Sequence, residues 1–212
     1  ASIRQQWSPE QISGRLRHEG NPTVSHEWIY QHIARDKAKG GSLHEHLRCR
    51  RKRRKRYGKP STKGVLVNQI SIDERPASVD EKSRLGDWEV DSVIGKGHQQ
   101  SIVTMVERKS KLLRMKKIAH KTGVLTRDAI CAELNDFVVK TITSDNGKEF
   151  SEHEEIAKKL HADFYFCHPY SSWERGVNEN TNGLIRQYFP KQKEFATITE
   201  MDIQAAQEKL NH

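Results

Sequence analysis

In the run Trp88-Glu89-Val90-Asp91-Ser92-Val93-Ile94, polar and apolar side chains alternate with a period of two. This alternation predicts a β-strand with one face turned toward a core. Two more strand-like runs follow after turn-sized gaps, at residues 101–106 and 112–118. We therefore expect three consecutive strands in this part of the chain.

Helices alternate with single strands beyond residue 120. Apolar Ile130, Leu134 and Phe137 recur at helical spacing within residues 126–137. A strand at about 138–143, a helix at 152–160, a strand at 164–166 and a long helix at 172–188 follow. This order indicates an α/β fold with a mixed five-stranded sheet flanked by helices.

Three carboxylates stand out in these elements. Asp91 lies in the first strand, Asp145 directly follows the fourth strand, and Glu179 lies in the long helix. Mg²⁺ binds through few carboxylates together with substrate phosphates. Three acids brought together from two strands and a helix would hold two such ions about 3.5–4 Å apart. Because the chain has 28 acidic residues, the alternative is that these three are ordinary surface charges.

The long helix has two distinct faces. One carries polar and charged side chains at i, i+4, i+7 and i+11, namely Arg175, Glu179, Asn182 and Arg186. The opposite face is mostly apolar and carries Val177, Thr181, Leu184 and Tyr188. We expect the apolar face to pack on the sheet and the other face to present Glu179.

The start of the chain predicts a pair of short helices. Ser8-Pro9-Glu10-Gln11 has the pattern of a capped helix start, and Gly20-Asn21-Pro22 that of a stop. Ser25 begins a second helix, with an apolar side that comprises Trp28, Ile29 and Ile33. Ser25, His26, Tyr30 and Gln31 are then candidates for DNA contacts in a helix-turn-helix. A generic helical hairpin is the alternative.

The net charge of +9 is concentrated in one segment. Residues 48–63 contain ten Lys or Arg and no acid, and the remainder has 27 basic and 28 acidic residues. Such a segment is expected to be extended until a polyanion neutralises it, with salt-dependent phosphate contacts. The candidate contacts are Arg50, Arg51, Arg53 and Arg54. A localisation signal or a solubilising linker is the alternative.

Composition excludes several classes of protein. No run approaches the roughly 20 apolar residues of a membrane helix, and no signal peptide opens the chain. Three scattered cysteines form no disulfide framework, which favours a reducing compartment. A start without Met and an end in a helical stretch indicate a fragment of a longer protein.

Four sequence blocks together resemble a known family. They are Trp7-Ser8-Pro9-Glu10-Gln11-Ile12, Gly86-Asp87-Trp88-Glu89-Val90-Asp91, Thr143-Ser144-Asp145-Asn146-Gly147-Lys148-Glu149-Phe150 and Glu174-Arg175-Gly176-Val177-Asn178-Glu179-Asn180-Thr181-Asn182-Gly183-Leu184-Ile185-Arg186. Through essentially all 212 residues the chain resembles bacterial insertion-sequence transposases of the DDE class, most closely the IS-thirty family. The resemblance implies an RNase H-like, integrase-like catalytic core behind a small α-helical helix-turn-helix domain.

The resemblance also assigns roles to residues. It implies that Asp91, Asp145 and Glu179 are catalytic and hold the metals, and the 33 residues between the last two match the family's usual interval. Some transposases of this class carry a Tyr, Arg, Glu and Lys pattern around the last acid. This chain has Ser172 at the Tyr position and Arg186 at the Lys position.

Four residues near the predicted acids are candidate DNA contacts. Arg175 and Arg186 are expected to hold phosphates that flank the scissile one, and Trp173 to stack on an unpaired base. Asn146 follows the second aspartate and completes the set. The alternative is that Trp173 packs under a loop and that both arginines balance nearby acids.

The function implied by the resemblance is DNA transposition. It comprises Mg²⁺-dependent strand cleavage at element ends and strand transfer of the 3′-hydroxyl into target DNA. Two Mg²⁺ ions are expected, with Mn²⁺ able to substitute. Expected partners are the terminal inverted repeats, target DNA and further copies of the chain, in the bacterial cytoplasm at the nucleoid and without a membrane.

The domains expected are a helix-turn-helix domain at 1–47, a basic linker at 48–75 and a truncated catalytic domain at 76–212. Two other functions are weighed against transposition. A DNA-binding repressor with an inactive second half would not need all three acids. A retroviral-type integrase would carry a zinc-binding His/Cys front that this sequence lacks.

Overall fold

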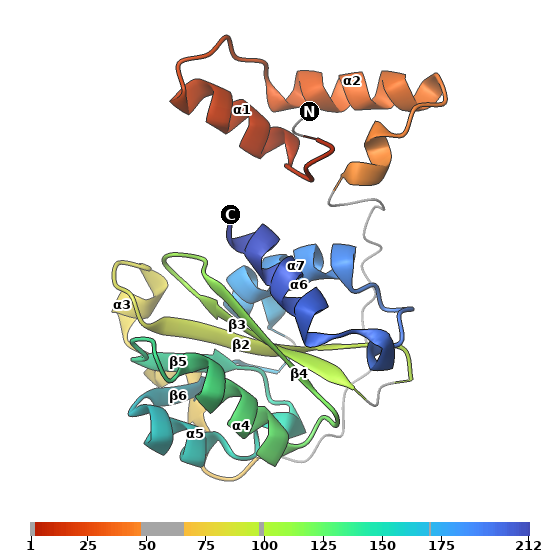
Figure 1. Ribbon diagram of the computed structural model, residues 1–212. Helices are drawn as coiled ribbons and strands as arrows, with labels where there is room; N and C mark the ends of the chain where they lie inside the picture. Colours follow the sequence, from red (N-terminus) through yellow and green to blue (C-terminus); the bar gives the residue numbers. More distant parts are fainter. Residues whose placement is uncertain (1–2, 48–65, 98–99, 170) are drawn as a thin grey trace. The chain divides into compact units, whose positions relative to one another are not determined.

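The computed structural model describes residues 3–47, 66–97, 100–169 and 171–212. It divides into two compact units, Ala1–Lys59 and Pro60–His212, each described here by itself (Figure 1). The predicted contacts Arg50, Arg51, Arg53 and Arg54 lie outside the described residues. None of the described helices is long and apolar enough to cross a membrane.

The first unit contains helices α1 (Pro9–His18) and α2 (His26–Ala38), followed by the 3₁₀ turn η1 (Leu43–His46). The predicted start of α1 is confirmed, because Ser8 Oγ accepts a hydrogen bond from the backbone N–H of Gln11 at 3.2 Å. The side chain of Gln11 in turn accepts one from the backbone N–H of Ser8 at 2.9 Å. This reciprocal pair satisfies two N–H groups at the helix start.

Helix α2 differs from its prediction at one residue. Ile29 and Ile33 are buried as expected, but Trp28 is 50% exposed. Its ring stacks on that of His32, with centroids 5.4 Å apart, so one turn of α2 carries an aromatic pair at the surface. A direct link between the two helices is made by the hydroxyl of Tyr30, which donates to Glu10 at 3.1 Å.

The second unit is built on a six-stranded sheet with the order β1-β6-β5-β2-β3-β4. The strands are β1 (Ile70–Ser71), β2 (Asp87–Ile94), β3 (Ser101–Glu107), β4 (Leu113–Ile118), β5 (Thr141–Ser144) and β6 (Asp163–Phe166). Strands β2, β3 and β4 are antiparallel neighbours, whereas β5, β6 and β1 add in parallel on the other side of β2. The five expected strands are therefore present, and the two-residue β1 extends the sheet by a sixth.

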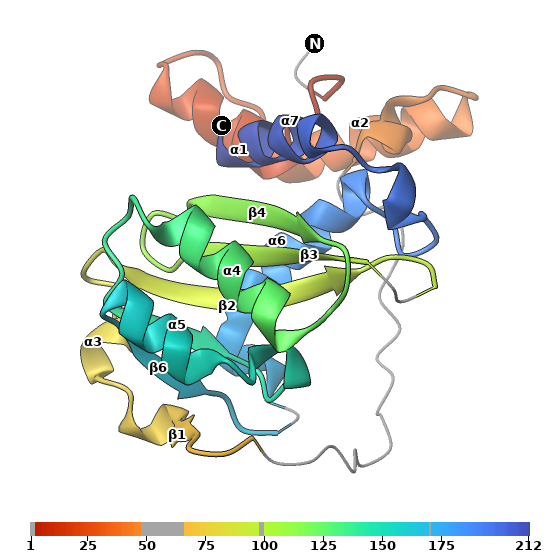
Figure 2. The same ribbon diagram turned by 60° about the horizontal axis from the view of Figure 1, so that its bottom comes forward.

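Helices cover both faces of this sheet (Figure 2). On one face, α4 (Gly123–Leu134) and α5 (His153–Leu160) enclose a core with β2, β3, β5 and β6. On the other face, α6 (Gly176–Tyr188) and α7 (Glu200–Asn211) enclose a second core. Short helical segments connect these elements: η2 (Ile72–Glu74), α3 (Ala77–Asp80), η3 (Lys148–Phe150), η4 (Ser172–Arg175) and η5 (Phe195–Thr197).

Strand β2 has an apolar and a polar face. Trp88 and Val90 belong to the core below α4 and α5. The alternate residues Asp87, Glu89 and Asp91 lie on the opposite face, as a period of two requires. The first half of α6 meets this face through hydrogen bonds to Glu89, whereas Val93, near the end of β2 on the same face, joins the apolar core shared with α6 and α7.

The prediction that the apolar face of the long helix packs on the sheet is therefore wrong at its first half. Asn178 is fully buried there, and its side-chain amide donates to the backbone carbonyl of Glu89 at 3.0 Å. Ile185 is the buried apolar contact in the second half of α6. Val177 and Tyr188, from the face predicted to be apolar, are only partly buried at the edge of the second core.

A buried carboxylate fixes the first turn of α6. Glu89 Oε2 accepts a hydrogen bond from the backbone N–H of Asn178 at 2.8 Å, and Glu89 Oε1 pairs with Arg108 at 2.9 Å. Both side chains are almost completely buried. A negative group at a helix N-terminus is stabilised by the helix dipole and by free N–H groups.

We expect Glu89→Ala to lower the free energy of unfolding by about 3 kcal/mol, since it leaves Arg108 buried without its nearest partner. Asp80 remains 3.3 Å from Arg108, which limits the loss. Urea denaturation of the whole chain measures it. The matched control is Glu155→Ala at an exposed position of α5, with an expected change within about 0.5 kcal/mol. Equal changes in both variants would contradict the role of Glu89.

Candidate active site

Asp91 and Asp145 lie at the same end of two neighbouring strands. Strands β2 and β5 pair in parallel with Glu89 opposite Thr143, and each aspartate comes two residues later. Parallel neighbours lie about 4.8 Å apart, so the strand pairing itself brings these two carboxylates together.

Arg175 joins the two aspartates. Its Nη1 lies 3.1 Å from Asp91 Oδ2, and its Nη2 lies 3.6 Å from Asp145 Oδ2. The side chain is buried and also donates to the backbone carbonyl of Val90 at 3.2 Å. Burial acts to lower the pKa of Arg175, but the charges of Asp91 and Asp145 outweigh it and raise the pKa. Arg175 is thus held as a cation between two acids.

The remaining oxygens of the aspartates are held by the backbone. Asp91 Oδ1 accepts from the N–H of Ser92 at 2.7 Å, and Asp145 Oδ1 accepts from the N–H of Gly147 at 2.9 Å. Desolvation raises the pKa of Asp145, the attraction of Arg175 opposes this, and the nearby charge of Asp91 raises it further. The two carboxylates therefore repel each other and depend on a cation between them.

Helix α6 adds polar groups to this pair. Asn182 Nδ2 donates to Asp91 Oδ2 at 3.0 Å. The hydroxyl of Thr104 lies 3.1 Å from Asn182 Oδ1 and 3.2 Å from Asn178 Oδ1, so it donates to one of them at a time. Glu179 lies in the first turn of α6 and is partly buried.

The donor set fits a divalent cation in part. Asp91 and Asp145 both face the guanidinium of Arg175. Carboxylate oxygens are also the ligands that Mg²⁺ prefers. Across residues 3–47, 66–97, 100–169 and 171–212, no group of three or more His, Cys, Asp or Glu side chains is placed to hold a metal ion. Glu179 as a third ligand therefore stays a prediction.

Arg175, predicted to contact DNA, pairs here with Asp91 and Asp145, as the alternative expected. Two more of the residues predicted to contact DNA also bind the chain itself in this structure. Arg186 donates to the backbone carbonyls of Ile94 at 2.9 Å and Phe189 at 3.3 Å. Asn146 donates to the carbonyl of Cys167 at 2.7 Å and accepts from Gln69 at 2.9 Å. In this state both side chains brace the ends of elements around the aspartates.

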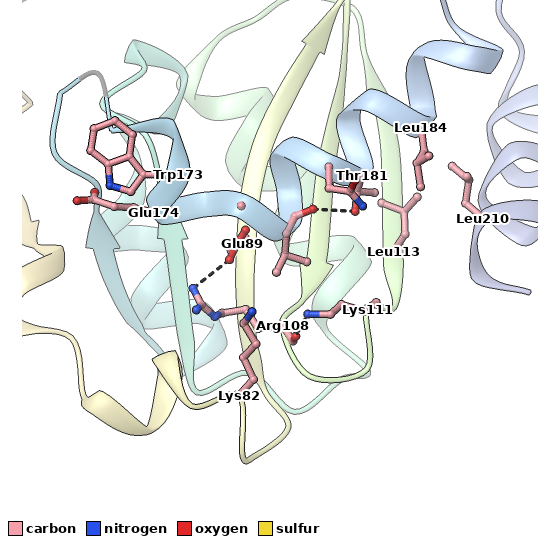
Figure 3. A pocket seen from close by; sticks show the side chains of 13 residues that line it. Lys82, Glu89, Arg108, Lys111, Leu113, Trp173, Glu174, Thr181, Leu184 and Leu210 are labelled. Carbon is pink, nitrogen blue, oxygen red and sulfur yellow. Dashed lines mark hydrogen bonds and ion pairs between the residues drawn. The ribbon is translucent and has the colours of Figure 1, made fainter. Parts of the chain in front are cut away.

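Trp173 is 72% exposed, so the alternative that it packs under a loop does not hold. It lies at one end of a cavity of about 420 Å³ beside α6, shown in Figure 3. Cationic side chains, among them Lys82 and Arg108, line another part of this cavity, and apolar Leu184 lies near Leu113 and Leu210 in a third part.

The sequence interpretation missed Glu149, which lies inside the block that was quoted for Asp145. Glu149 is buried, pairs with Lys121 at 2.6 Å and accepts from the hydroxyl of Ser92 at 2.9 Å. Its charge also raises the pKa of Asp145. The available signal for Glu149 was its place in the same sequence block as Asp145. Its partners Lys121 and Ser92 lie far away in the sequence, so the contacts themselves could not be predicted.

His168 also escaped the sequence interpretation. Its Nδ1 lies 2.8 Å from a carboxylate oxygen of Glu174, and its Nε2 lies 2.9 Å from one of Asp73. A neutral imidazole has one N–H, whereas two carboxylates accept only, so both contacts are hydrogen bonds only in the protonated form. The hydrogen bonds to Glu174 and Asp73 accordingly raise the pKa of His168. This clamp ties the segment before Trp173 to η2.

Together these features define the class of protein: an RNase H-like α/β domain with aspartates at the ends of two adjacent central strands. A chain of the simian T-cell lymphotropic virus intasome, solved by cryo-EM in complex with PP2A regulatory subunit B56 gamma, has the same fold. The match has a TM-score of 0.51 and 18% identity, and covers 60% of this chain and 48% of that one.

Sequence comparison shows a narrower similarity within this class. No family model matches the chain. It is 46% identical over 213 residues to the transposase for insertion sequence element IS4351 of Bacteroides fragilis, covering 99% of this chain and 65% of that protein. It is 36% identical over 222 residues to transposase InsI for IS30A of Escherichia coli (strain K12), covering 97% of this chain and 57% of that protein. The chain is thus similar over nearly its whole length to insertion-sequence transposases, and it spans 57–65% of the length of these two proteins.

The His168 clamp predicts a pH-dependent contribution to stability. Because its pKa is raised above the unfolded value of 6.5, the stabilisation is fully present below that value and is lost as pH rises through the folded pKa. We expect the melting temperature of the wild type to exceed that of His168→Gln at about pH 6, and the difference to shrink toward about pH 9. The control is His120→Gln at an exposed position. A difference that is constant with pH, or equal in the control, would refute the clamp.

Proposed function

We propose that this chain is part of a DNA transposase, which cleaves DNA at element ends and joins the 3′-hydroxyl to target DNA. The observation that carries the proposal is the convergence of Asp91 and Asp145 on one cation position. The RNase H-like sheet and the similarity to insertion-sequence transposases support it. The enzyme class proposed is a DDE-type polynucleotidyl transferase.

In the proposed mechanism, Asp91, Asp145 and Glu179 hold Mg²⁺ or Mn²⁺. Bound there, two such ions would activate water or a 3′-hydroxyl and stabilise charge at the phosphorus. The chain's own contribution is to fix the ligand atoms. The backbone N–H groups of Ser92 and Gly147 orient one oxygen of each aspartate, and Asn182 orients the second oxygen of Asp91.

DNA binding is assigned in this proposal to helix α2 and to the basic segment that follows the helix pair. His26 and Gln31 are exposed on α2 and available to base edges. Ser25 caps α2 through the N–H of Trp28 at 3.1 Å, which leaves it a supporting role. Tyr30 is 42% exposed and is oriented by its bond to Glu10. The basic residues of 48–63 add contacts to phosphates.

The larger organisation follows the same proposal. A helix-turn-helix domain at 1–47, a basic linker and a catalytic domain would act on terminal repeats and target DNA. The linker was predicted to extend to residue 75, but β1 (Ile70–Ser71) pairs with β6, so the sheet of the catalytic domain begins before the predicted bound of 76. The chain would assemble as a homo-oligomer on DNA at the bacterial nucleoid.

We expect Asp91→Asn, Asp145→Asn and Glu179→Gln each to reduce cleavage to background, because ligation of a divalent cation needs the charge. DNA affinity should stay near that of the wild type. Nicking of a labelled duplex with the inverted repeat that flanks the gene, in Mg²⁺ and in Mn²⁺, measures cleavage by the full-length protein. Glu155→Gln is the matched exposed control. Wild-type nicking by one of the three variants would remove that residue from the site.

Trp173→Ala should weaken binding to a duplex with unpaired bases at its end by about 1–3 kcal/mol, because a stacking contact is lost. Its unfolding free energy should change by less than about 0.5 kcal/mol, since the side chain is 72% exposed. Fluorescence anisotropy and urea denaturation measure the two quantities. The control is Met201→Ala, which removes a side chain that is 78% exposed on α7. Identical DNA affinities of both variants would contradict stacking.

A further inference from the structure

The guanidinium of Arg175 takes up the oxygen atoms that a divalent cation would use. It contacts Oδ2 of Asp91 at 3.1 Å and Oδ2 of Asp145 at 3.6 Å. The two Oδ1 atoms are held by backbone N–H groups that do not involve Arg175. The aspartates therefore have positional restraints of their own, and Arg175 supplies the positive charge between them.

The hydrogen-bonding capacity of the Arg175 side chain is incompletely satisfied. Among the described residues, its buried Nε has no hydrogen-bond partner. A buried donor without a partner is destabilising. The arginine is therefore held between Asp91 and Asp145 by their charges and by one hydrogen bond to the Val90 carbonyl.

Removal of the side chain from this position does not require α6 to move. Arg175 precedes the first residue of α6, and that helix is anchored by the bond between Glu89 and the N–H of Asn178. At the far end, Arg186 ties α6 to the carbonyl of Ile94. Movement of the Arg175 side chain would break its contacts with both Oδ2 atoms and with the Val90 carbonyl, whereas the hydrogen bond from Asn182 to Asp91 Oδ2 would remain.

We propose, resting on the function proposed above, that Arg175 is an internal counter-ion that competes with a divalent cation for Asp91 and Asp145. The guanidinium neutralises the acid pair while the cation is absent and leaves it when the cation binds. Simultaneous occupation would place like charges within a few ångströms of each other, beside carboxylates that are only partly exposed, 22% for Asp91 and 45% for Asp145, which is unfavourable. Arg175 consequently sets the affinity of the site for the cation.

Binding of Mn²⁺ to the full-length protein without DNA tests this competition. Isothermal titration calorimetry and the electron paramagnetic resonance signal of free Mn²⁺ both give the dissociation constant. We expect Arg175→Gln to bind Mn²⁺ roughly tenfold more tightly than the wild type, because one competing charge is removed. Arg175→Lys, which keeps the charge on a different group, should lie nearer the wild type.

A matched control is Arg127→Gln. Arg127 is also paired with two carboxylates, those of Asp128 and Glu152, but it lies on α4. The Arg127→Gln variant should bind Mn²⁺ as the wild type does.

Thermal unfolding gives a second measurement. Saturating Mn²⁺ should raise the melting temperature of Arg175→Gln by more than that of the wild type, because tighter binding to the folded state stabilises it more. Circular dichroism verifies that each variant is folded.

The outcomes separate this inference from the proposed function. Unchanged or weaker Mn²⁺ binding by folded Arg175→Gln, with metal-dependent nicking intact in the wild type, would overturn the counter-ion role alone. If Asp91→Asn bound Mn²⁺ as tightly as the wild type, the proposed metal site itself would fail. Tighter binding by Arg175→Gln that disappears in the double variant with Asp91→Asn would establish the competition at this site.

Discussion

The carboxylate of Glu89 accepts a hydrogen bond from the first turn of α6, and the placement of the candidate site depends on this contact. At the N-cap, Arg175 makes no side-chain capping bond, and a buried acid from β2 meets one of the free N–H groups instead. Burial raises the pKa of Glu89 above its ordinary value. The Asn178 N–H and the charge of Arg108 offset only part of this rise. Because the acid is fixed in the sheet, the helix is fixed with it, and Arg175 and Asn182 are brought to Asp91.

The same face of β2 carries three acids, each with an arginine. Arg84 pairs with Asp87 at 3.0 Å, Arg108 with Glu89 at 2.9 Å, and Arg175 with Asp91 at 3.1 Å. The exposure of the acid side chain rises along the strand, from 0% for Asp87 and 1% for Glu89 to 22% for Asp91. Separating a fully buried acid from its arginine is costly, since that acid would be left without solvent or its charged partner. Asp91 is partly exposed and can exchange its cation more easily, which supports structural roles for Asp87 and Glu89 and the chemical role proposed for Asp91.

Whether a feature of this structure could be predicted from the sequence depends on how far apart in the sequence its residues lie. The period of two at Trp88 to Ile94 and the capping pattern at Ser8 are local, and both were predicted. The convergence of Asp91 and Asp145 follows from strand pairing once β2 and β5 are recognised. The packing face of α6 was predicted incorrectly, because apolar periodicity does not reveal that Asn178 is buried through a partner 89 residues away. The His168 clamp was missed for the same reason, since Asp73 is 95 residues from it.

Helix α6 combines support and chemistry on adjacent faces. Ile185 and Phe189 anchor its second half in the core shared with α7, while Asn178 anchors its first half on β2. A helix fixed at both ends cannot shift toward or away from the sheet without breaking buried contacts, which are costly in a close-packed interior. Changes at the aspartates must therefore come from side chains rather than from the elements that carry them. Arg175 stands where η4 meets α6, so its long side chain can move while the helix that presents Glu179 stays in place.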